Sequence, residues 1–430
     1  MTNLSGANPG AASLAGAPWL TDPVVQRVFS LLNADGGEGR VVGGAVRNAL
    51  MGAPISDLDF ATTLLPQAVM ERAKTDGIKA VPTGLAHGTV TLVIEGRPFE
   101  VTTLRRDIET DGRHAEVSFG TDWQADAERR DFTINALYVT ADGTVIDLID
   151  GLKDIPTRTL RFIGDAETRI AEDYLRVLRF FRFFAYYGSG RPDADGLRAS
   201  AKARDRLGGL SAERIWAEMK KLLSAPDPSR ALLWMRTTGV LAAVLPESEK
   251  WGIDAIHGLV AAEQSLGWAP DALLRLAAIV PPDPERLEAL AKRWRLSNAE
   301  AERLVQWGRS PVPAVDLAET ALDRLLYRNG KAGIVMRLKL SLASARYAAQ
   351  SSDDDLLKAA RWSALLKRAE KFEKPKFPLN GADAMALGVP AGPRIGQLLS
   401  ELETLWVERN FTLDRAALAA RLKEKVDAGS

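Results

Sequence analysis

The chain has 430 residues, of which 46% are hydrophobic and 26% are charged, and its 56 basic residues balance 56 acidic ones. This length predicts more than one domain, and the absence of cysteine excludes disulfides, thiolate metal sites and a cysteine nucleophile. The three histidines are too scattered for a histidine-rich metal site, and no apolar run approaches the roughly 18 residues of a membrane span.

The first 24 residues are rich in small side chains and contain no lysine or arginine. We expect a disordered lead-in over residues 1–24. The segment lacks the charged start of a signal peptide and the arginines of a mitochondrial transit peptide, so we expect a cytoplasmic protein.

Residues 25–165 alternate short β-rich runs with helical stretches and predict an α/β head. A strand is expected over residues 40–42, ending at Gly43 and Gly44, and the helix that follows it is expected to stop at Gly52. A second strand is expected over residues 57–61. Two hairpins are expected to turn at Glu95-Gly96 and at Asp142-Gly143.

From about residue 166 onward the sequence predicts amphipathic helices separated by proline and glycine. The clearest of these helices is expected over residues 170–188. The architecture predicted by the sequence is therefore an α/β head followed by an all-helical remainder.

Two aspartates, Asp57 and Asp59, are separated by one residue. On a strand this spacing places both carboxylates on one face, while Leu58 and Phe60 point into a core. Carboxylates this close repel each other unless a cation lies between them, and Mg²⁺ accepts one or two carboxylates together with substrate phosphates. The pair alone is weak evidence for a metal site, and its surroundings strengthen the interpretation.

Gly43 and Gly44 lie at the predicted strand-to-helix junction, where backbone N–H groups and the helix dipole attract phosphate. Arg47 lies about one turn into that helix, within reach of the same anion. A phosphate-binding turn some dozen residues before a metal-binding pair is the layout that a nucleoside triphosphate needs.

Glu100 is the candidate third acidic ligand, because a carboxylate in an otherwise apolar strand is costly if buried without a partner. The alternative is a glutamate on an edge strand that faces water. Two metals at this site would activate a 3′-hydroxyl and stabilise a leaving pyrophosphate. No histidine is placed as a general base, which is typical of reactions that depend on positioning and metal charge.

An ordered set of segments resembles the class II tRNA nucleotidyltransferases and bacterial poly(A) polymerases. The segments cover about residues 40–222 and are GGAVRNALMG, SDLDFATT, HGTVTL, FEVTTLR, DGRHAEV, ERRDFTINAL, AEDYLRVLRFFRF and ERIWAEMKK. Each motif is modest alone, whereas their order is highly specific. LNGADAMALGVPAGPRIGQLL resembles the family loosely.

The resemblance implies an α+β fold with a polymerase-β-like nucleotidyltransferase head, followed by an all-helical neck, body and tail. We place the head at residues 25–165 and a neck that recognises the nucleobase at residues 166–230. The body then spans residues 231–355, and a tail that binds tRNA spans residues 356–430.

The resemblance also implies roles for the acidic residues of the head. Asp57 and Asp59 would bind the catalytic metals, and Glu100 matches the third acidic position. One departure concerns Asn48, which stands where the family commonly carries aspartate. We expect this change to alter local hydrogen bonding without affecting metal binding.

For the nucleotide, the resemblance places Asp131 at the ribose and Arg130 and Asn135 beside the triphosphate. From the residues alone, Arg129 and Arg130 read as a solvated basic pair. Residues 107–118 resemble a flexible loop that the family uses when it switches from C to A addition, with His114 as a loop contact.

Asp173 and Arg176 are three residues apart and would share a face of the helix predicted over residues 170–188. Alone, this spacing favours a surface salt bridge. The resemblance implies instead that the pair is a protein template for the incoming base, oriented by Glu172 and Arg179. A carboxylate accepts from the exocyclic amine of cytosine or adenine and arginine donates to the neighbouring ring acceptor, whereas uracil and guanine present a carbonyl.

The most basic stretch of the helical half spans residues 356–377. We predict that Lys367, Arg368 and Lys371 contact the tRNA backbone, and that their replacement by alanine weakens RNA binding and its salt dependence. The alternative is a solvated lysine-rich helix face. Because the net charge is zero, RNA contacts have to come from local patches of this kind.

Together these features predict template-independent addition of CCA to the 3′ end of tRNA from CTP and ATP, with Mg²⁺ as cofactor. They imply no membrane association and no obligate protein partner. A poly(A) polymerase is the nearest rival function, although the chain lacks a strongly basic C-terminal extension. Two more distant rivals are a catalytically inactive RNA-binding protein and an enzyme that transfers a nucleotide to a small molecule.

Overall fold

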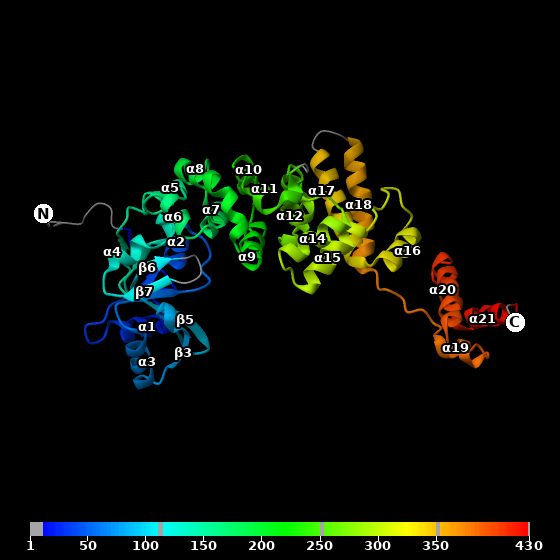
Figure 1. Ribbon diagram of the computed structural model, residues 1–430, viewed down its shortest axis with the longest axis horizontal. Helices are drawn as coiled ribbons and strands as arrows, with labels where there is room; N and C mark the ends of the chain where they lie inside the picture. The colour runs from blue at the N-terminus through cyan, green and yellow to red at the C-terminus, as the bar shows by residue number, and fades with distance from the viewer. Residues whose placement is uncertain (1–11, 111–114, 250–252, 350–352, 429–430) are drawn as a thin grey trace. The chain divides into compact units, whose positions relative to one another are not determined.

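The computed structural model describes residues 12–428 except 111–114, 250–252 and 350–352. The chain divides into two units, residues 1–244 and residues 245–430. The first unit contains the sheets, and the described part of the second unit contains helices without strands (Figure 1). An α+β head followed by helices is the fold expected from the sequence.

The first unit is built on a seven-stranded sheet with the order β3-β4-β5-β2-β1-β8-β9. β2 and β5 pair in parallel, and the other neighbours pair antiparallel. β6 and β7 form a separate two-stranded sheet. The strands are β1 (Gly39–Val42), β2 (Asp59–Thr62), β3 (Lys79–Gly84), β4 (Thr89–Ile94), β5 (Arg97–Thr103), β6 (Arg105–Thr110), β7 (Ala115–Phe119), β8 (Leu137–Val139) and β9 (Val145–Asp147).

Helices flank the sheet, and further helices make up the rest of the first unit. The helices are α1 (Pro23–Asn33), α2 (Gly44–Met51), α3 (Pro66–Thr75), α4 (Trp123–Glu128), α5 (Asp154–Thr157), α6 (Ala166–Glu172), α7 (Leu175–Tyr187), α8 (Ala194–Ala203), α9 (Ala212–Leu223), α10 (Ser229–Thr237) and α11 (Val240–Val244). Three short 3₁₀ helices lie between them, η1 (Leu85–His87), η2 (Thr133–Asn135) and η3 (Arg204–Gly209).

The lead-in predicted to be disordered over residues 1–24 is ordered from residue 12 onward, so that part of the prediction is wrong. Ser13 bridges Thr144, and Leu20 is buried. Asp22 then caps α1 by accepting from the N–H of Val24, with proline at the first helical position. The apolar side chains of this segment were overlooked because small residues surround them. Residues 1–11 lie outside the described part of the chain.

The strand-turn-helix over residues 39–52 forms as predicted. Gly43 has φ 74° and Gly52 has φ 67°, a region that side-chain-bearing residues rarely adopt, so the two glycines set the start and the end of α2. The predicted hairpins also form. β4 and β5 pair Ile94 with Arg97 across the first turn, and β8 pairs with β9 across the second.

The helix predicted over residues 170–188 is broken. α6 ends at Glu172, Asp173 has an extended backbone (φ −153°, ψ 106°), and α7 begins at Leu175. The periodic pattern continues across the break because both helices bury apolar side chains, so periodicity could not reveal it.

An aromatic cluster joins α7 to the segment before η2. The ring of Phe132 lies 4.9 Å from Phe162, 6.3 Å from Phe180 and 5.2 Å from Phe183, measured between centroids. Tilted aromatic pairs at these separations add stabilisation to the burial of their area. The cluster therefore fixes α7 against the part of the head that precedes η2.

The second unit consists of helices and a short 3₁₀ turn, η4 (Pro246–Ser248). Its helices are α12 (Ala255–Leu266), α13 (Ala272–Ile279), α14 (Pro284–Arg293), α15 (Asn298–Arg309), α16 (Glu319–Asn329), α17 (Lys331–Ala348), α18 (Asp353–Lys371), α19 (Gly381–Ala386), α20 (Pro393–Glu408) and α21 (Arg415–Ala428). One core cluster lies among α16, α17 and α18, and another among α19, α20 and α21.

Two of the predicted domain boundaries fall inside helices. The boundary at 230/231 lies in α10, whose buried residues pack with the first unit, and the division between units falls after Val244. The boundary at 355/356 lies in α18, which packs along α17. Both predicted boundaries therefore cut through helices, although Pro246 and Pro375 follow the ends of α11 and α18 and were available as signals.

A buried ion pair joins α12 to α13. Glu263 and Arg275 are 3% and 1% exposed and lie 2.6 Å apart. Burial raises the pKa of Glu263, and Arg275 opposes that effect. We expect Glu263→Ala to lower the free energy of unfolding by about 3–5 kcal/mol, because it leaves a buried charge without its carboxylate. Chemical denaturation monitored by tryptophan fluorescence would measure the loss.

The double replacement Glu263→Met/Arg275→Met is the matched control, since exchanging both charges for apolar groups is often nearly neutral. A cost below about 1 kcal/mol for the single variant would show that other contacts or water satisfy the guanidinium of Arg275.

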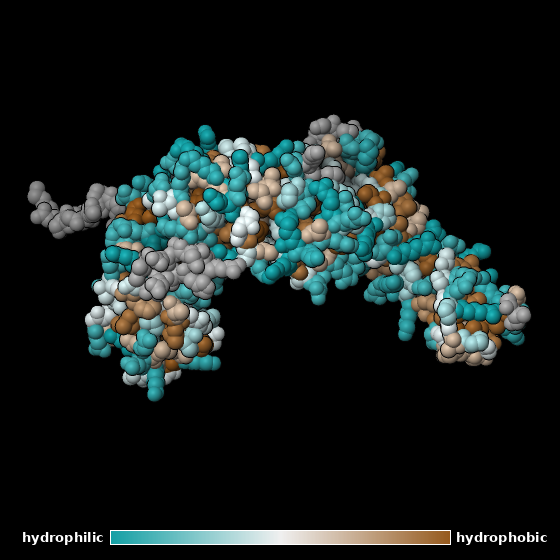
Figure 2. All heavy atoms as spheres, viewed as in Figure 1, coloured by the Kyte–Doolittle hydropathy of each residue, from teal (hydrophilic) through white to brown (hydrophobic). Residues whose placement is uncertain are grey.

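In the described part of the chain, no helix is both long enough and apolar enough to cross a membrane. On the face seen in Figure 2, hydrophilic residues predominate and apolar residues form scattered patches.

Candidate active site

Two carboxylates lie side by side on one face of the head sheet, and a third lies just before it in the chain. Asp59 is the first residue of β2 and pairs in register with Glu100 of the parallel strand β5. Neighbouring strands lie roughly 4.8 Å apart, so register partners present their side chains side by side. Asp57, Asp59 and Glu100 are exposed, whereas Leu58, Phe60 and Phe99 are buried. The predicted division into an acidic face and an apolar face is confirmed.

Two details differ from expectation. Asp57 precedes the strand, because β2 begins at Asp59 and not at residue 57. Glu100 is neither buried nor on an edge strand, because β5 lies between β4 and β2 and the residue faces outward. Strand order cannot be read from a single apolar run, which is why the sequence did not show that Glu100 is exposed on a strand inside the sheet.

The carboxylates repel one another. Partial burial raises the pKa of Asp59, the charges of Glu100 and Asp57 raise it further, and Arg130 opposes them. A divalent cation would relieve this repulsion, and oxygen donors of this kind fit Mg²⁺. The three side chains do not form a ready-made cage, since no cluster of three metal-ligating side chains is found in the described residues. The chemistry of the donors therefore fits a metal that substrate phosphates help to hold.

The glycine turn lies between this face and the residues before η2. The N–H of Gly43 donates to the carbonyl of Leu137 at 3.1 Å, so that donor belongs to the sheet. A Cβ on Gly43 would lie 3.5 Å from the carbonyl of Asn135 and 3.8 Å from Nη1 of Arg130. The turn is thus close to Arg130, and the N–H groups of the first turn of α2 remain for an anion.

Arg47, which the sequence placed within reach of a bound anion, is engaged in contacts inside the protein. Its guanidinium is buried, donates from Nη1 to Asn135 at 2.5 Å and from Nη2 to the hydroxyl of Tyr187 at 2.7 Å, and stacks on the ring of Tyr187 at 3.8 Å. Burial lowers the pKa of Arg47, and Tyr187 partly offsets this. Arg47 therefore joins α2 to α7 and supports the glycine turn from behind.

Asn48 shows what the departure from the family pattern does. Its Oδ1 accepts from Nε and Nη2 of Arg47 at 3.1 and 2.9 Å, and its Nδ2 donates to the carbonyl of Pro54 at 2.7 Å. An aspartate would keep the first contacts but would lose the donor to Pro54. The expected change in local hydrogen bonding is therefore located at the loop that leads to Asp57.

Asp131 lies at the centre of a polar network. It accepts from Asn135 at 3.0 Å, from the N–H of Phe132 at 2.9 Å and from Arg179 at 2.5 and 3.0 Å. Burial would raise the pKa of Asp131, but the charge of Arg179 and these hydrogen bonds hold it below its usual value. Asp131 is therefore an ionised acceptor, held between the head and α7.

Arg130 is held by Asp126, a residue that sequence reasoning missed. Asp126 is buried and accepts from Arg129, from Arg130 at 3.0 Å and from the hydroxyl of Tyr138 at 2.8 Å. Burial would lower the pKa of Arg130, but Asp126 and Tyr138 raise it overall. The interpretation of Arg129 and Arg130 as a solvated pair is wrong. The spacing of Asp126 and Arg130, four residues, was the available signal.

The predicted base-reading pair lies at the break between α6 and α7. Asp173 precedes α7 instead of sharing a helix face with Arg176, which corrects that prediction. Glu172 accepts from Nη1 of Arg176, and Arg169 donates to the same carboxylate at 2.6 and 2.8 Å. Arg169 also donates to the carbonyls of Arg129 and Arg130, so it ties Glu172 and Arg176 to the head.

Two further contacts had no sequence signal, because the residues are far apart in the chain. Arg214 of α9 donates to Oδ2 of Asp173 at 2.6 Å. Arg182 of α7 donates to Glu218 of α9 at 2.6 Å, and both side chains are largely buried. Arg179 donates its hydrogen bonds to Asp131, while the charge of Asp173 contributes to raising the pKa of Arg179.

The flexible loop predicted over residues 107–118 lies partly outside the described residues. His114 is among residues 111–114, which the structure does not describe. Residues 107–110 and 115–118 belong to the strands β6 and β7, which pair antiparallel.

The predicted RNA-binding residues lie on α18 and are exposed. Arg368 donates to Asp323 of α16 at 2.5 and 3.0 Å and lies 3.4 Å from Glu319. Its guanidinium therefore holds α16 against α18. Within the described chain, Lys367 and Lys371 form no ion pair.

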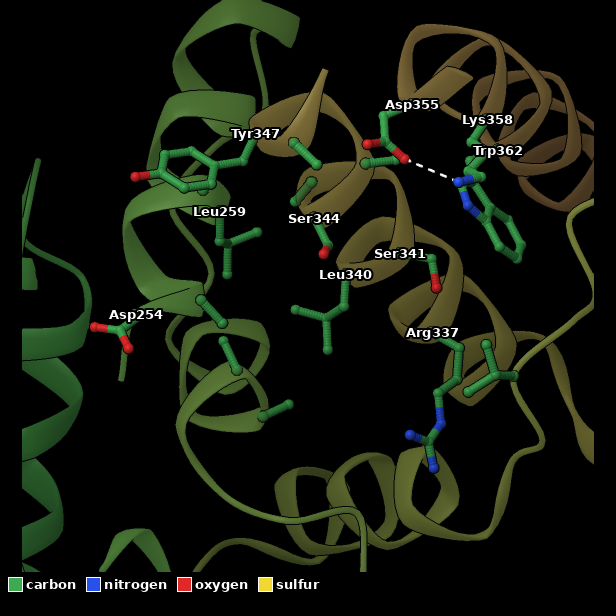
Figure 3. A pocket seen from close by; sticks show the side chains of 18 of the residues that line it. Asp254, Leu259, Arg337, Leu340, Ser341, Ser344, Tyr347, Asp355, Lys358 and Trp362 are labelled. Carbon is green, nitrogen blue, oxygen red and sulfur yellow. Dashed lines mark hydrogen bonds and ion pairs between the residues drawn. The ribbon is translucent and has the colours of Figure 1, made fainter. Parts of the chain in front are cut away.

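A pocket of about 700 Å³ lies in the second unit among α12, α13, α17 and α18 (Figure 3). Small side chains form much of its lining, and Lys358 donates to Asp355 at 3.0 Å on one side. Arg337 donates to the carbonyls of Ser310 and Gly308 at 2.9 and 3.1 Å. The residues that line it include none of those predicted for catalysis or nucleotide binding.

Two family models match parts of the first unit and its border. One is described as the poly A polymerase head domain and matches residues 39–161, the segment that contains the acidic face and the glycine turn. The other is described as "Probable RNA and SrmB- binding site of polymerase A" and matches residues 193–251.

Curated relatives match almost the whole chain. The mouse (Mus musculus) protein "CCA tRNA nucleotidyltransferase 1, mitochondrial" is 34% identical over 394 residues, which are 90% of this chain and 86% of the relative. The CCA-adding enzyme of Streptococcus gordonii is 32% identical over 409 residues, 93% of this chain and 96% of that enzyme.

Solved structures agree with these relatives. The Bacillus stearothermophilus CCA-adding enzyme in complex with CTP superposes with a TM-score of 0.74 at 27% identity, covering 94% of this chain and 97% of that one. The Thermotoga maritima CCA-adding enzyme complexed with tRNA shares the fold with a TM-score of 0.65 at 19% identity, covering 97% and 99%.

Proposed function

This chain belongs to the family of CCA tRNA nucleotidyltransferases, and we propose that it completes the 3′ end of tRNA at the acidic face formed by Asp57, Asp59 and Glu100. It adds C, C and A from CTP and ATP without a nucleic acid template. The observation that supports this site best is the register of Asp59 with Glu100, close to Arg130 and the glycine turn.

In each addition the 3′ oxygen of the tRNA forms a bond to the α-phosphorus of the nucleotide. The bond from that phosphorus to the bridging oxygen breaks, pyrophosphate leaves, and the 3′-hydroxyl loses its proton. Mg²⁺ held by Asp57 and Asp59, and by the substrate phosphates, would make the hydroxyl more acidic and offset the negative charge of the triphosphate. Glu100 completes the acidic face from the neighbouring strand.

The remaining contacts position the nucleotide. The first turn of α2 presents N–H groups to phosphate, and Arg130 adds a fixed positive charge near Gly43. Asp131, ionised and held by Arg179 and Asn135, accepts from the ribose. Arg47 and Asn135 serve as supports for this network. Positioning of this kind replaces a general base in metal-dependent phosphoryl transfer.

Asp173 and Arg176 select the base. In this proposal Asp173 accepts from the exocyclic amine of cytosine or adenine, and Arg176 donates to the adjacent ring nitrogen. Glu172 supports the role by fixing one side of Arg176, whose other N–H groups remain for the base.

Nucleotide binding separates this function from an inactive RNA-binding protein. Calorimetric titration with CTP should show binding that needs Mg²⁺ and is lost in Asp57→Ala/Asp59→Ala. Binding of tRNA without any metal-dependent binding of CTP would favour the RNA-binding function. A poly(A) polymerase would instead bind ATP well and CTP poorly.

We also propose that Lys367 and Lys371 contact the tRNA backbone. Lys367→Ala/Lys371→Ala should weaken tRNA binding and reduce the slope of log K against log salt by about 1.5, since each phosphate contact contributes roughly 0.7–0.9. Fluorescence anisotropy over a salt series would measure it. Arg368→Ala is the control, because its ion pairs with α16 predict a loss of stability more than a change in slope. An unchanged slope in the double variant would contradict the proposal.

The relatives include a mouse mitochondrial protein and a bacterial enzyme. The cytoplasmic location expected from the sequence therefore stays a prediction.

A further inference from the structure

Asp173 lies in a break between two helices, so its own backbone belongs to neither of them. Two contacts hold the side chain. The N–H of Leu175 donates to Oδ1 at 3.1 Å, and Nη2 of Arg214 donates to Oδ2 at 2.6 Å. The side chain of Asp173 is 23% exposed, so it is accessible to a base. The direction of this carboxylate therefore depends strongly on Arg214.

Arg214 comes from a helix that is itself firmly placed. It lies in the first turn of α9, which buries Ile215, Trp216 and Met219. The buried pair of Arg182 and Glu218 fastens α9 to α7. Because α7 also carries Arg176, Arg214 holds Asp173 at a fixed offset from Arg176.

The two halves of the base-reading pair are thus supported separately. Glu172 holds Arg176 from the side of α6, and Arg214 holds Asp173 from the side of α9. We propose that Arg214 is a specificity-determining positioning residue, which aims the carboxylate of Asp173 so that an amine is accepted and a carbonyl is refused. This inference rests on the proposed role of Asp173 and Arg176 in base selection.

The chemistry of the carboxylate allows both contacts at once. Each oxygen has two acceptor positions, so Oδ2 can accept from Arg214 and still leave room for an exocyclic amine. Without Arg214 the N–H of Leu175 still holds Oδ1, but Oδ2 loses the contact that sets its acceptor direction. Hydrogen bonds discriminate only where their geometry is held. The triphosphate contacts lie elsewhere and should persist.

The test compares Arg214→Ala, Arg214→Lys and the wild type. kcat/KM would be measured for CTP and UTP on tRNA that lacks CCA, and for ATP and GTP on tRNA that ends in CC. We expect the preference for CTP over UTP to fall about tenfold in Arg214→Ala, within the range that one base-edge contact supplies. Arg214→Lys should recover part of it. Arg198→Ala, which breaks an exposed pair with Asp195 on α8, should leave it unchanged.

An equal loss for all four nucleotides, with the preference intact, would overturn the inference and reduce Arg214 to a structural residue. Asp173→Ala is measured in parallel. If Asp173→Ala loses the preference and Arg214→Ala keeps it, the role of Arg214 alone fails. If Asp173→Ala also keeps it, the base-reading site itself fails. If Arg214→Ala does not fold, Arg214→Lys and Arg214→Gln are tested instead, and the same ratio of kcat/KM for CTP over UTP is measured.

Discussion

Asp59→Asn should reduce the rate of nucleotide incorporation by about 10³-fold or more. The charge of a bound metal stabilises such transition states by several kcal/mol, and each 1.36 kcal/mol corresponds to a tenfold change in rate. The amide keeps the shape of the carboxylate but removes the charge that would hold the cation. Burial raises the pKa of Asp59 and the charges of Glu100 and Asp57 raise it further, so a cation held there would relieve their repulsion. Single-turnover incorporation of CTP would measure the loss.

Asp57→Asn should have a comparable effect, and Asp205→Asn is the matched control. Asp205 is an exposed carboxylate on η3 with a weak partner in Arg204 at 3.5 Å. The melting temperature of Asp59→Asn should not be lower than that of the wild type, because the substitution removes repulsion between neighbouring carboxylates. Retention of incorporation within tenfold of the wild type would place the metal somewhere other than this face.

Asp173→Ala should lower the preference for CTP over UTP by about 10- to 100-fold, since a good base-edge pair contributes roughly 1–3 kcal/mol of discrimination. The carboxylate is the acceptor that distinguishes an amine from a carbonyl. Arg176→Ala should reduce the same preference by removing the donor to the ring nitrogen. The ratio of kcat/KM for the two nucleotides, each assayed on tRNA lacking CCA, is the measurement.

For each nucleotide, the rate of incorporation should fall by a smaller factor than the preference for CTP over UTP. The reason is that the acidic face and Asp131 are unaltered in these variants. Glu167→Ala provides a control on α6, where an exposed pair with Lys202 is broken. A uniform loss of rate with an unchanged preference would mean that Asp173 supports the neck and does not read the base.

The sequence was most informative about segments whose structure is set locally. Gly43 and Gly52 mark the limits of α2 because only glycine adopts their backbone angles easily. Leu58 and Phe60 alternate with the aspartates, and this alternation indicates which face is buried. These features predicted an α/β head and drew attention to the aspartate pair, and the resemblance to a known family supplied the type of head and the proposed roles of its acidic residues.

Contacts between distant segments could not be predicted in the same way. Arg214 and Asp173 are 41 residues apart, and no spacing rule links them. The break at Asp173 was hidden because the apolar periodicity continues through it. Arg47 was expected to contact phosphate directly, yet its guanidinium is buried against Tyr187, a residue 140 positions away. Each of these facts depends on how elements pack, which a single sequence does not reveal.

Whether this chain completes the 3′ end of tRNA is decided by sequencing the products of one incubation. The protein and Mg²⁺ are mixed with tRNA transcripts that end before CCA, after C and after CC. With CTP and ATP together, we expect every transcript to be completed to CCA and addition then to stop, with no product from Asp57→Ala/Asp59→Ala. A long adenosine tract on these ends, or no incorporation by the wild-type protein, would contradict the proposed function.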